Sequence, residues 1–358
     1  MKSFIKLLLV FLFMISISAC TVTENKILTN LTIPENTKYF VSGGIIHGGE
    51  ESQAAVFENN LIFYFSENGE MLGKEQLFDD DLSHIVSYLA NNMYITAYNK
   101  DILRIDMQTG EVATFYKIPE KNAEIWRMKV IGNSLFMQYA VYETDYRISK
   151  NAICILNVDD ANDKKCLELD GSGFDAIVVN KTVYAWNLMS GELIEYDLNL
   201  EKISSSQIGT ECILSYDDSN LYVLYSEEIL DVSDGKKYSF DLPLDFYEHR
   251  INGEELILAE IYITEGGEEN SGVFTQVISA YNIISGKKQR EKVLSPGYGT
   301  TLFNDEGNVY ISSYDELSMT IIPFDFATFE LSQTELVINA EEKGSVILVY
   351  GLYEYSKK

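Results

Sequence analysis

The sequence predicts an all-β fold, a seven-bladed β-propeller built from four-stranded antiparallel blades, and two features of the chain predict it. A hairpin of two strands around a tight turn recurs seven times, with turns near residues 69, 110, 161, 200, 235, 286 and 328. A second, shorter hairpin precedes most of these, so that each repeat of roughly 35–50 residues holds four strands, the spacing of propeller blades. One such sheet cannot bury both of its faces, whereas neighbouring sheets in a ring can.

Residues 173–209 show the repeat most clearly. Four strands, FDAIVV, TVYAWNL, ELIEYDL and KISSSQIG, are joined by turns at 180–181, 189–191 and 199–201. The strands are rich in Val, Ile, Tyr and Trp, which favour pleated structure, and the turns carry Asn, Ser and Gly, which tolerate tight-turn dihedrals. This segment therefore predicts one complete blade.

The chain begins with the layout of an export signal over residues 1–19. A basic start with Lys2 and Lys6 is followed by an apolar run that is short for a membrane span. Residues 17–20, Ile-Ser-Ala-Cys, resemble the bacterial lipobox. This resemblance implies that Cys20 carries lipid, with palmitate among its acyl chains, and becomes the first mature residue; an ordinary secretory signal is the alternative.

An anchored protein follows from that resemblance. More than one acyl chain holds a protein stably on a membrane, because each buried CH₂ contributes about 0.8 kcal/mol. We therefore predict an extracytoplasmic lipoprotein of the bacterial cell envelope, with a polar tether over residues 20–37 and the propeller over residues 38–358. Whether the membrane is the inner or the outer one is left open.

The seven long hairpins follow one another along the chain with similar patterns. They occupy residues 61–77, 102–118, 152–169, 192–208, 227–242, 277–294 and 319–337.

The first repeat lacks an innermost strand on its N-terminal side, because residues 38–45 would form its second strand. The run GSVILVYGLYEY at 344–355 is apolar, β-prone and left over after the seventh repeat. We predict that it supplies the missing strand and closes the ring, which covers two sheet edges. Repeats 1, 3 and 6 have long connections between their second and third strands, and residues 48–69 resemble residues 266–286, which indicates internal duplication.

At the level of architecture the chain resembles the PQQ-like and WD-like propellers of bacteria. It contains only two tryptophans, Trp126 and Trp186, so it lacks their repeated tryptophan docking motif, and it has no Gly-His or Trp-Asp repeat signature. The resemblance covers residues 38–358 and implies a fold alone, so it transfers no functional residue.

The formal net charge of −28 limits the partners of the protein. Removing residues 1–19, with two lysines and no acid, changes it from −28 to −30. Such a chain repels nucleic acid and anionic surfaces, so we expect no nucleic-acid partner. Solubility by itself also accounts for a high charge.

Two cysteines flank one turn symmetrically. Cys154 and Cys166 are expected to stand opposite each other on the outer strands of the third repeat. That position permits a disulfide in an exported protein, and two buried reduced thiols are the alternative. Cys212 has no evident partner, and no CxxC, CxxH or HxxxH spacing indicates a zinc site.

Polar and aromatic residues recur where an innermost strand is expected to begin. In a propeller these starts and the connections between second and third strands emerge on one face, so their side chains form a ring around the axis. We predict a ligand pocket there, with no metal and no cofactor, and ordinary residues of the rim are the alternative. Its candidate residues are His47, His84, Trp126, Arg127, Asp175, Glu211, His249 and Arg250.

We interpret the chain as a non-catalytic binding or interaction module whose ligand is a protein, a peptide or a glycan. No nucleophile elbow, P-loop or dinucleotide fingerprint is present in the sequence. A glycan-active hydrolase or lyase at the channel mouth is the first alternative, since paired carboxylates need proximity only in space. An envelope-assembly scaffold is the second.

Overall fold

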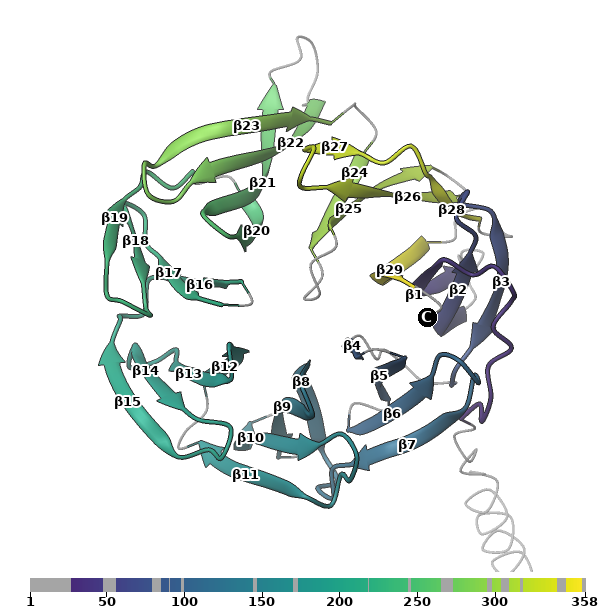
Figure 1. The fold of residues 1–358 in the computed structure, drawn as a ribbon, viewed down its shortest axis with the longest axis horizontal. Coiled ribbons are helices and arrows are strands. Elements are labelled where there is room, and N and C mark those ends of the chain that lie inside the picture. Colours follow the sequence, from purple (N-terminus) through teal and green to yellow (C-terminus); the bar gives the residue numbers. More distant parts are fainter. Residues whose placement is uncertain are drawn as a thin grey trace, which may run out of the picture.

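In the computed structural model, seven antiparallel sheets stand in a ring, which confirms the predicted seven-bladed β-propeller (Figure 1). Within the described residues all regular secondary structure is strand, with no helix. The structure describes residues 27–47, 56–78, 85–89, 91–97, 100–143, 147–169, 173–217, 219–243, 246–264, 273–294, 298–303, 309–315, 318–339 and 346–355.

Each blade is named here by its order in the chain, and its strands are given from the innermost outward. Blade 1 holds β29 (Val346–Glu354), β1 (Tyr39–His47), β2 (Val56–Phe65) and β3 (Met71–Gln76). Blade 2 holds β4 (Val86–Leu89), β5 (Asn92–Ala97), β6 (Asp101–Asp106) and β7 (Val112–Lys117). Blade 3 holds β8 (Ala123–Ile131), β9 (Ser134–Tyr142), β10 (Ile148–Asn157) and β11 (Lys164–Leu169).

The remaining blades follow the same order. Blade 4 holds β12 (Phe174–Val179), β13 (Thr182–Asn187), β14 (Glu192–Tyr196) and β15 (Lys202–Gln207). Blade 5 holds β16 (Ile213–Tyr216), β17 (Leu221–Leu224), β18 (Glu228–Asp231) and β19 (Lys237–Ser239). Blade 6 holds β20 (Phe246–Asn252), β21 (Glu255–Thr264), β22 (Val273–Asn282) and β23 (Lys287–Val293). Blade 7 holds β24 (Tyr298–Phe303), β25 (Val309–Asp315) and β26 (Ser318–Asp325), and its outer position is shared by β27 (Glu330–Leu331) and β28 (Leu336–Asn339).

The C-terminal strand closes the ring as predicted. β29 pairs antiparallel with β1, and Val41 stands opposite Leu352. Just beyond β29, the Tyr355 hydroxyl donates to the Met107 carbonyl of blade 2 at 3.1 Å. The first blade is therefore assembled from both ends of the chain, and β29 leaves no unpaired edge on β1.

The hydrophobic core is divided among the seven interfaces between adjacent blades. Successive residues of a strand point to opposite faces of the sheet, so each strand serves two interfaces. In β2, Ile62 and Tyr64 pack toward blade 2, whereas Leu61, Phe63 and Phe65 pack toward blade 7. Continuous apolar runs in these strands therefore reflect burial on both faces.

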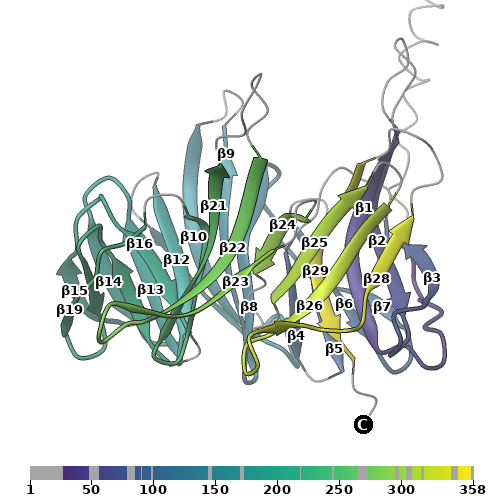
Figure 2. The same cartoon turned by 90° about the horizontal axis from the view of Figure 1, so that it is seen from above.

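Blades 3 and 6 are taller than their neighbours. The strands β9, β10, β21 and β22 contain 9, 10, 10 and 10 residues, whereas β17 and β18 of blade 5 contain 4 each. Figure 2 shows these long hairpins rising on one side of the ring. This side is the b–c face, where the second and third strands of each blade are joined.

The described part of the predicted tether lies against the propeller. Leu31 is 2% exposed in the core between blades 1 and 2. Its N–H donates to the Gly110 carbonyl at 2.7 Å, and a Cβ on Gly110 would lie 2.0 Å from the Leu31 carbonyl oxygen. Residues 27–37 therefore differ from a free linker, because apolar side chains within this polar stretch are buried.

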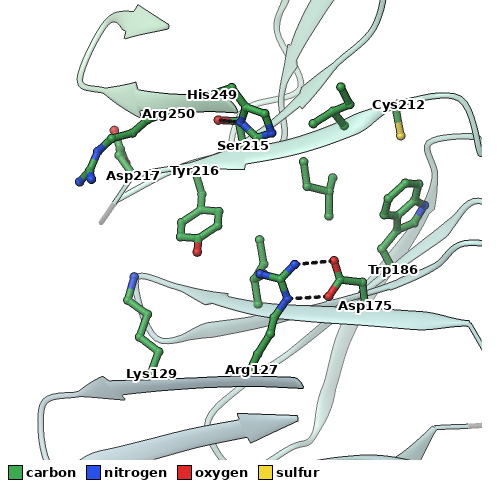
Figure 3. Close-up of a pocket in the computed structure, with 13 residues that line it drawn as sticks. Arg127, Lys129, Asp175, Trp186, Cys212, Ser215, Tyr216, Asp217, His249 and Arg250 are labelled. Carbon is green, nitrogen blue, oxygen red and sulfur yellow. Dashed lines mark hydrogen bonds and ion pairs between the residues drawn. The ribbon is translucent and has the colours of Figure 1, made fainter. Parts of the chain in front are cut away.

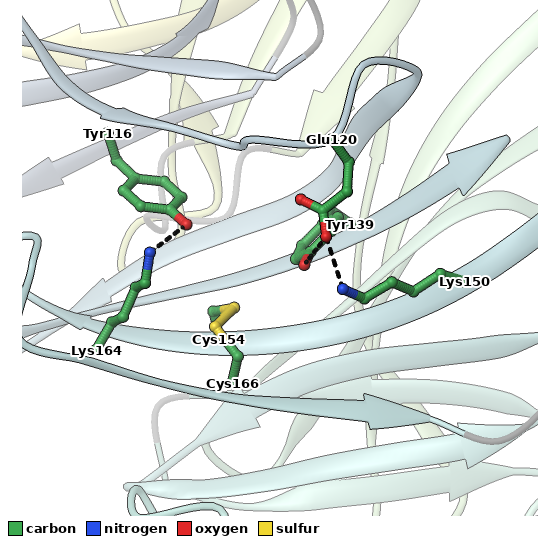
Figure 4. The surroundings of a disulfide bond; sticks show 7 residues. All are labelled: Tyr116, Glu120, Tyr139, Lys150, Cys154, Lys164 and Cys166. Atoms are coloured by element: carbon green, nitrogen blue, oxygen red, sulfur yellow. Dashed lines mark hydrogen bonds and ion pairs between the residues drawn. A yellow bond between two sulfur atoms is a disulfide. The ribbon is translucent and has the colours of Figure 1, made fainter.

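Cys154 and Cys166 form a disulfide across β10 and β11, where they stand directly opposite each other (Figure 4). Cys154 is 1% exposed and belongs to the core between blades 2 and 3. Beside the bridge, Lys164 Nζ donates to the Tyr116 hydroxyl of blade 2 at 2.8 Å. The bridge thus joins the two outer strands of blade 3, and next to it blade 3 also contacts blade 2.

Candidate functional site

A cavity of about 460 Å³ lies on the inner side of the ring and is called the inner cavity below (Figure 3). The innermost strands of blades 3, 4, 5 and 6 supply most of its wall. Such a volume accommodates a small organic ligand. Its lining residues are Arg127, Lys129, Asp175, Ile177, Trp186, Cys212, Ile213, Leu214, Ser215, Tyr216, Asp217, His249 and Arg250.

A two-pronged ion pair crosses from blade 3 to blade 4 in this cavity. Arg127 Nε donates to Asp175 Oδ1 at 2.7 Å, and Arg127 Nη2 donates to Asp175 Oδ2 at 2.8 Å. Their side chains are 39% and 31% exposed, so the pair is open to solvent. Parallel N–H···O bonds fix the plane of a guanidinium, and this pair therefore holds Arg127 in one orientation.

Two buried amides hold the backbone on either side of Asp175. Gln138 Nε2 donates to the Phe174 carbonyl at 2.8 Å, and Gln138 Oε1 accepts from the Ala176 N–H at 2.9 Å. Asn151 Nδ2 donates to the same Phe174 carbonyl at 3.1 Å. Because both amides come from blade 3, they lock β12 against that blade and position Asp175 for Arg127.

The opposite wall is β16 of blade 5. Tyr216 points from it toward the Arg127 guanidinium (Figure 3). Lys129 Nζ, two residues beyond Arg127 on β8, lies 5.2 Å from the centroid of the Tyr216 ring, within cation–π range. Blade 3 therefore reaches past blade 4 to contact blade 5 at this point of the ring.

A histidine and a thiol in the wall are both uncharged near neutral pH. His249 Nδ1 lies 3.1 Å from Ser215 Oγ, and burial lowers the pKa of His249 below its ordinary value of 6.5. Burial also raises the pKa of the Cys212 thiol to about 11. Both groups therefore act as neutral hydrogen-bonding or packing groups.

The cavity has the opposite charge balance to the whole chain. Among the described lining residues, three cationic side chains meet two carboxylates, an excess of one positive charge, in a protein of formal charge −28. The cations are Arg127, Lys129 and Arg250, and the acids are Asp175 and Asp217.

Four of the eight residues predicted from the sequence line this cavity together, and the described residues Trp126 and Glu211 are not in its lining. Trp126 donates its indole N–H to the Tyr142 hydroxyl at 3.2 Å and is not in the lining. Glu211 is exposed next to the lining residue Cys212. His47 ends β1, which is a second strand, and its side chain and the whole of His84 lie outside the described residues. The four that meet are Arg127, Asp175, His249 and Arg250.

Several lining residues, and the two buried amides that hold β12, were not predicted from the sequence. Lys129 follows Arg127 by two positions, and this spacing on a strand indicates the same side of the sheet. Gln138 and Asn151 were detectable as amides within apolar strands, because buried polar groups require partners. Ser215, Tyr216 and Trp186 carry no comparable signal.

The described residues also bear on two other kinds of site. No three His, Cys, Asp or Glu side chains lie together as a metal site would require within that part of the chain. No described helix is long and apolar enough to cross a membrane.

By sequence the chain matches no protein family, and it matches none of the curated proteins. Solved propellers are similar in fold. A Bacteroides fragilis protein provisionally assigned as a 6-phosphogluconolactonase is 12% identical, with a TM-score of 0.49, over 91% of this chain and 100% of that one. BamB from Moraxella catarrhalis is 10% identical, with a TM-score of 0.43, over 91% and 99% of the two chains.

AztD from Citrobacter koseri, in its apo form, is a third similar structure. It is 8% identical to this chain, with a TM-score of 0.44, over 87% of this chain and 98% of that one. Identities and scores at this level carry no functional argument. The blade count and strand pairing of this chain are therefore taken from its own sheets.

Proposed function

We propose that the chain is a lipid-anchored, extracytoplasmic propeller that binds a small ligand in the inner cavity and performs no chemistry on it. The anchoring half of the proposal is supported by the lipobox-like residues 17–20. The binding half is supported by one observation, which is the polar, rigidly held cluster around the Arg127–Asp175 pair inside a cavity of ligand size. Preorganised polar groups bind with less loss of conformational entropy.

The packed segment at 27–37 limits how far such an anchor could be from the propeller. With a lipid on Cys20, only residues 21–26 would lie between the anchor and the first described residue. A chain spans at most about 3.3–3.6 Å per residue, so the anchor could lie no more than roughly 25 Å from residue 27. We therefore place the propeller close to the membrane surface.

Binding is favoured over catalysis by the protonation states of the wall. A neutral thiol is a poor nucleophile, and burial keeps Cys212 in that state because its pKa rises to about 11. Ser215, whose hydroxyl lies 3.1 Å from His249 Nδ1, is only 2% exposed and is therefore shielded from a ligand that it would have to attack. A glycan-active hydrolase or lyase would instead need two carboxylates placed about the bond that breaks, and one of the two in this cavity, Asp175, is bound by Arg127.

A scaffold role would be favoured by a continuous apolar surface, since such surfaces mark protein partners. Among the described residues the exposed large apolar side chains are dispersed over blades 1, 4, 5 and 6, and only Leu188 and Met189 adjoin each other in the chain. Binding in the cavity therefore explains more of the described structure than docking of a large partner does.

The experiment that tests this function compares a filled cavity with an open one. The Ile213→Trp variant places an indole in the cavity, where Ile213 is 36% exposed. The Ile203→Trp variant makes the same change on the outer strand β15, where Ile203 is 58% exposed. Each protein is incubated with a small-molecule extract of the source cells' medium and examined by native mass spectrometry.

We expect the wild type and Ile203→Trp to retain the same small-molecule mass and Ile213→Trp to lose it, with the ligand recovered unchanged. An adduct that persists in Ile213→Trp would place the binding site elsewhere. Recovery of a converted ligand would favour the enzyme alternative over the binding module.

A further inference from the structure

We propose that the inner cavity selects a small organic anion, with one carboxylate or phosphate group beside an apolar or aromatic body. This inference rests on the proposed binding role of the cavity. It starts from charge, because the lining residues that the structure describes carry an excess of one positive charge in a chain of formal charge −28. The field of the negatively charged protein repels an anion. An anion can therefore bind here only where the local charge is positive.

The cationic groups are held in place by the structure. Asp175 fixes the Arg127 plane through bonds of 2.7 and 2.8 Å. Lys129 Nζ lies over the Tyr216 ring at 5.2 Å, and Arg250 Cζ lies over the Phe326 ring at 5.6 Å. Charged donors restrained in this way form strong hydrogen bonds to carboxylate or phosphate oxygens.

The same cavity offers an apolar side. Ile213, 36% exposed, supplies most of its open apolar surface, and Leu214, Ile177 and the Trp186 ring lie behind it in the core between blades 4 and 5. Apolar surface that faces a cavity gains free energy when a ligand removes it from water. A purely polar anion would leave that surface wet, and therefore the site favours an anion with an apolar body.

A cationic ligand fits the cavity less well. Of its two carboxylates, Asp175 is already bound through both oxygens by Arg127. The described residues contain no group of three His, Cys, Asp or Glu side chains suited to a metal ion. A cation would also meet the excess positive charge of the lining.

Trp186 supplies a direct reporter for the test. The chain has two tryptophans, and Trp126 lies outside the cavity lining. A Trp126→Phe background therefore leaves Trp186 as the single tryptophan, in the cavity wall. The probes are benzoate, phenyl phosphate, benzyl alcohol and benzylamine, which share one ring and differ in charge, and each is titrated against Trp186 fluorescence.

We expect benzoate or phenyl phosphate to bind at least about tenfold more tightly than benzylamine, the ratio given by one charged hydrogen bond. The tighter of the two anions then distinguishes a carboxylate ligand from a phosphate ligand. In the same background, Lys129→Met keeps the aliphatic stem and removes the charge, and we expect it to weaken anion binding about tenfold. Lys202→Met on the outer strand β15 is the matched control and should leave affinity unchanged.

Other results overturn the inference in distinguishable ways. Equal or tighter binding of benzylamine would refute the anion class, and so would no response to any of the four probes. Binding of benzyl alcohol alone would also refute it while leaving the cavity as a binding site. If near-UV circular dichroism shows that Lys129→Met is misfolded, Arg250→Met serves as the second variant, and unchanged anion affinity in a folded variant counts against the inference.

Discussion

Removal of the closing strand β29 should open the ring and unfold the protein. Four large side chains in this part of the chain are between 2% and 5% exposed. Three of them lie in β29 and the fourth follows it directly: Ile347, Leu352, Tyr353 and Tyr355. Full burial of a large side chain contributes roughly 1.5–3 kcal/mol, so the four together contribute roughly 6–12 kcal/mol. That range is comparable to the ~5–15 kcal/mol by which a typical domain is stable. Deletion of residues 344–358 therefore removes most of the available stability and exposes the edge of β1.

The assay is equilibrium denaturant unfolding followed by far-UV circular dichroism. Leu352→Ala provides a graded version, with an expected loss of about 2–5 kcal/mol from the buried side chain and its cavity. Deletion of residues 356–358 alone, which lie beyond β29, is the control and should leave the midpoint unchanged. A protein lacking residues 344–358 that unfolds at the wild-type midpoint would refute the closure argument.

Four further outcomes are expected. Cys20→Ser should abolish fatty-acid labelling and release the protein from the membrane fraction; labelling at the wild-type level would show that the lipobox interpretation is wrong. The double variant Cys154→Ala, Cys166→Ala should lower the free energy of unfolding by roughly 3 kcal/mol, the value for a loop of this length, as measured by denaturant titration. Leu31→Ala should cost about 2–5 kcal/mol in the same titration, because Leu31 is 2% exposed, and no change would mean that the segment is a free tether. Burial lowers the pKa of His249 below 6.5 in the folded state, so the unfolded chain takes up this proton at a higher pH than the folded chain does. The free energy of unfolding should therefore fall as pH decreases through 6.5, and His249→Asn should reduce this pH dependence.

The sequence by itself determined the architecture of this protein. Seven hairpins with local turn signals and β-prone strands predicted seven sheets, and the strands and turns of residues 173–209 appear as β12 to β15. The unpaired C-terminal run predicted the closing strand. These features are readable because alternation along a strand and the dihedrals of a turn depend on near neighbours in the chain.

Only the tertiary structure decided which side chains share the inner cavity. Arg127 and Asp175 are 48 residues apart, and their pairing depends on how blade 3 packs against blade 4. Trp126 adjoins Arg127 in the chain but bonds to Tyr142 of its own blade. Equivalent positions in successive repeats predicted a ring of candidate residues. The direction of each side chain within its strand then decides which of these candidates face the inner cavity.

The burial of the segment 27–37 was decided in the same way. Its composition is polar, yet Leu31 fills a position between two blades that no pattern within the segment reveals. The cysteines differ from this case, because their equal distances from one local turn predicted that Cys154 stands opposite Cys166, and the pairing of β10 with β11 confirms it. Contacts between distant segments are set by the packing of whole sheets, and the sequence of one segment does not encode the surface that covers it.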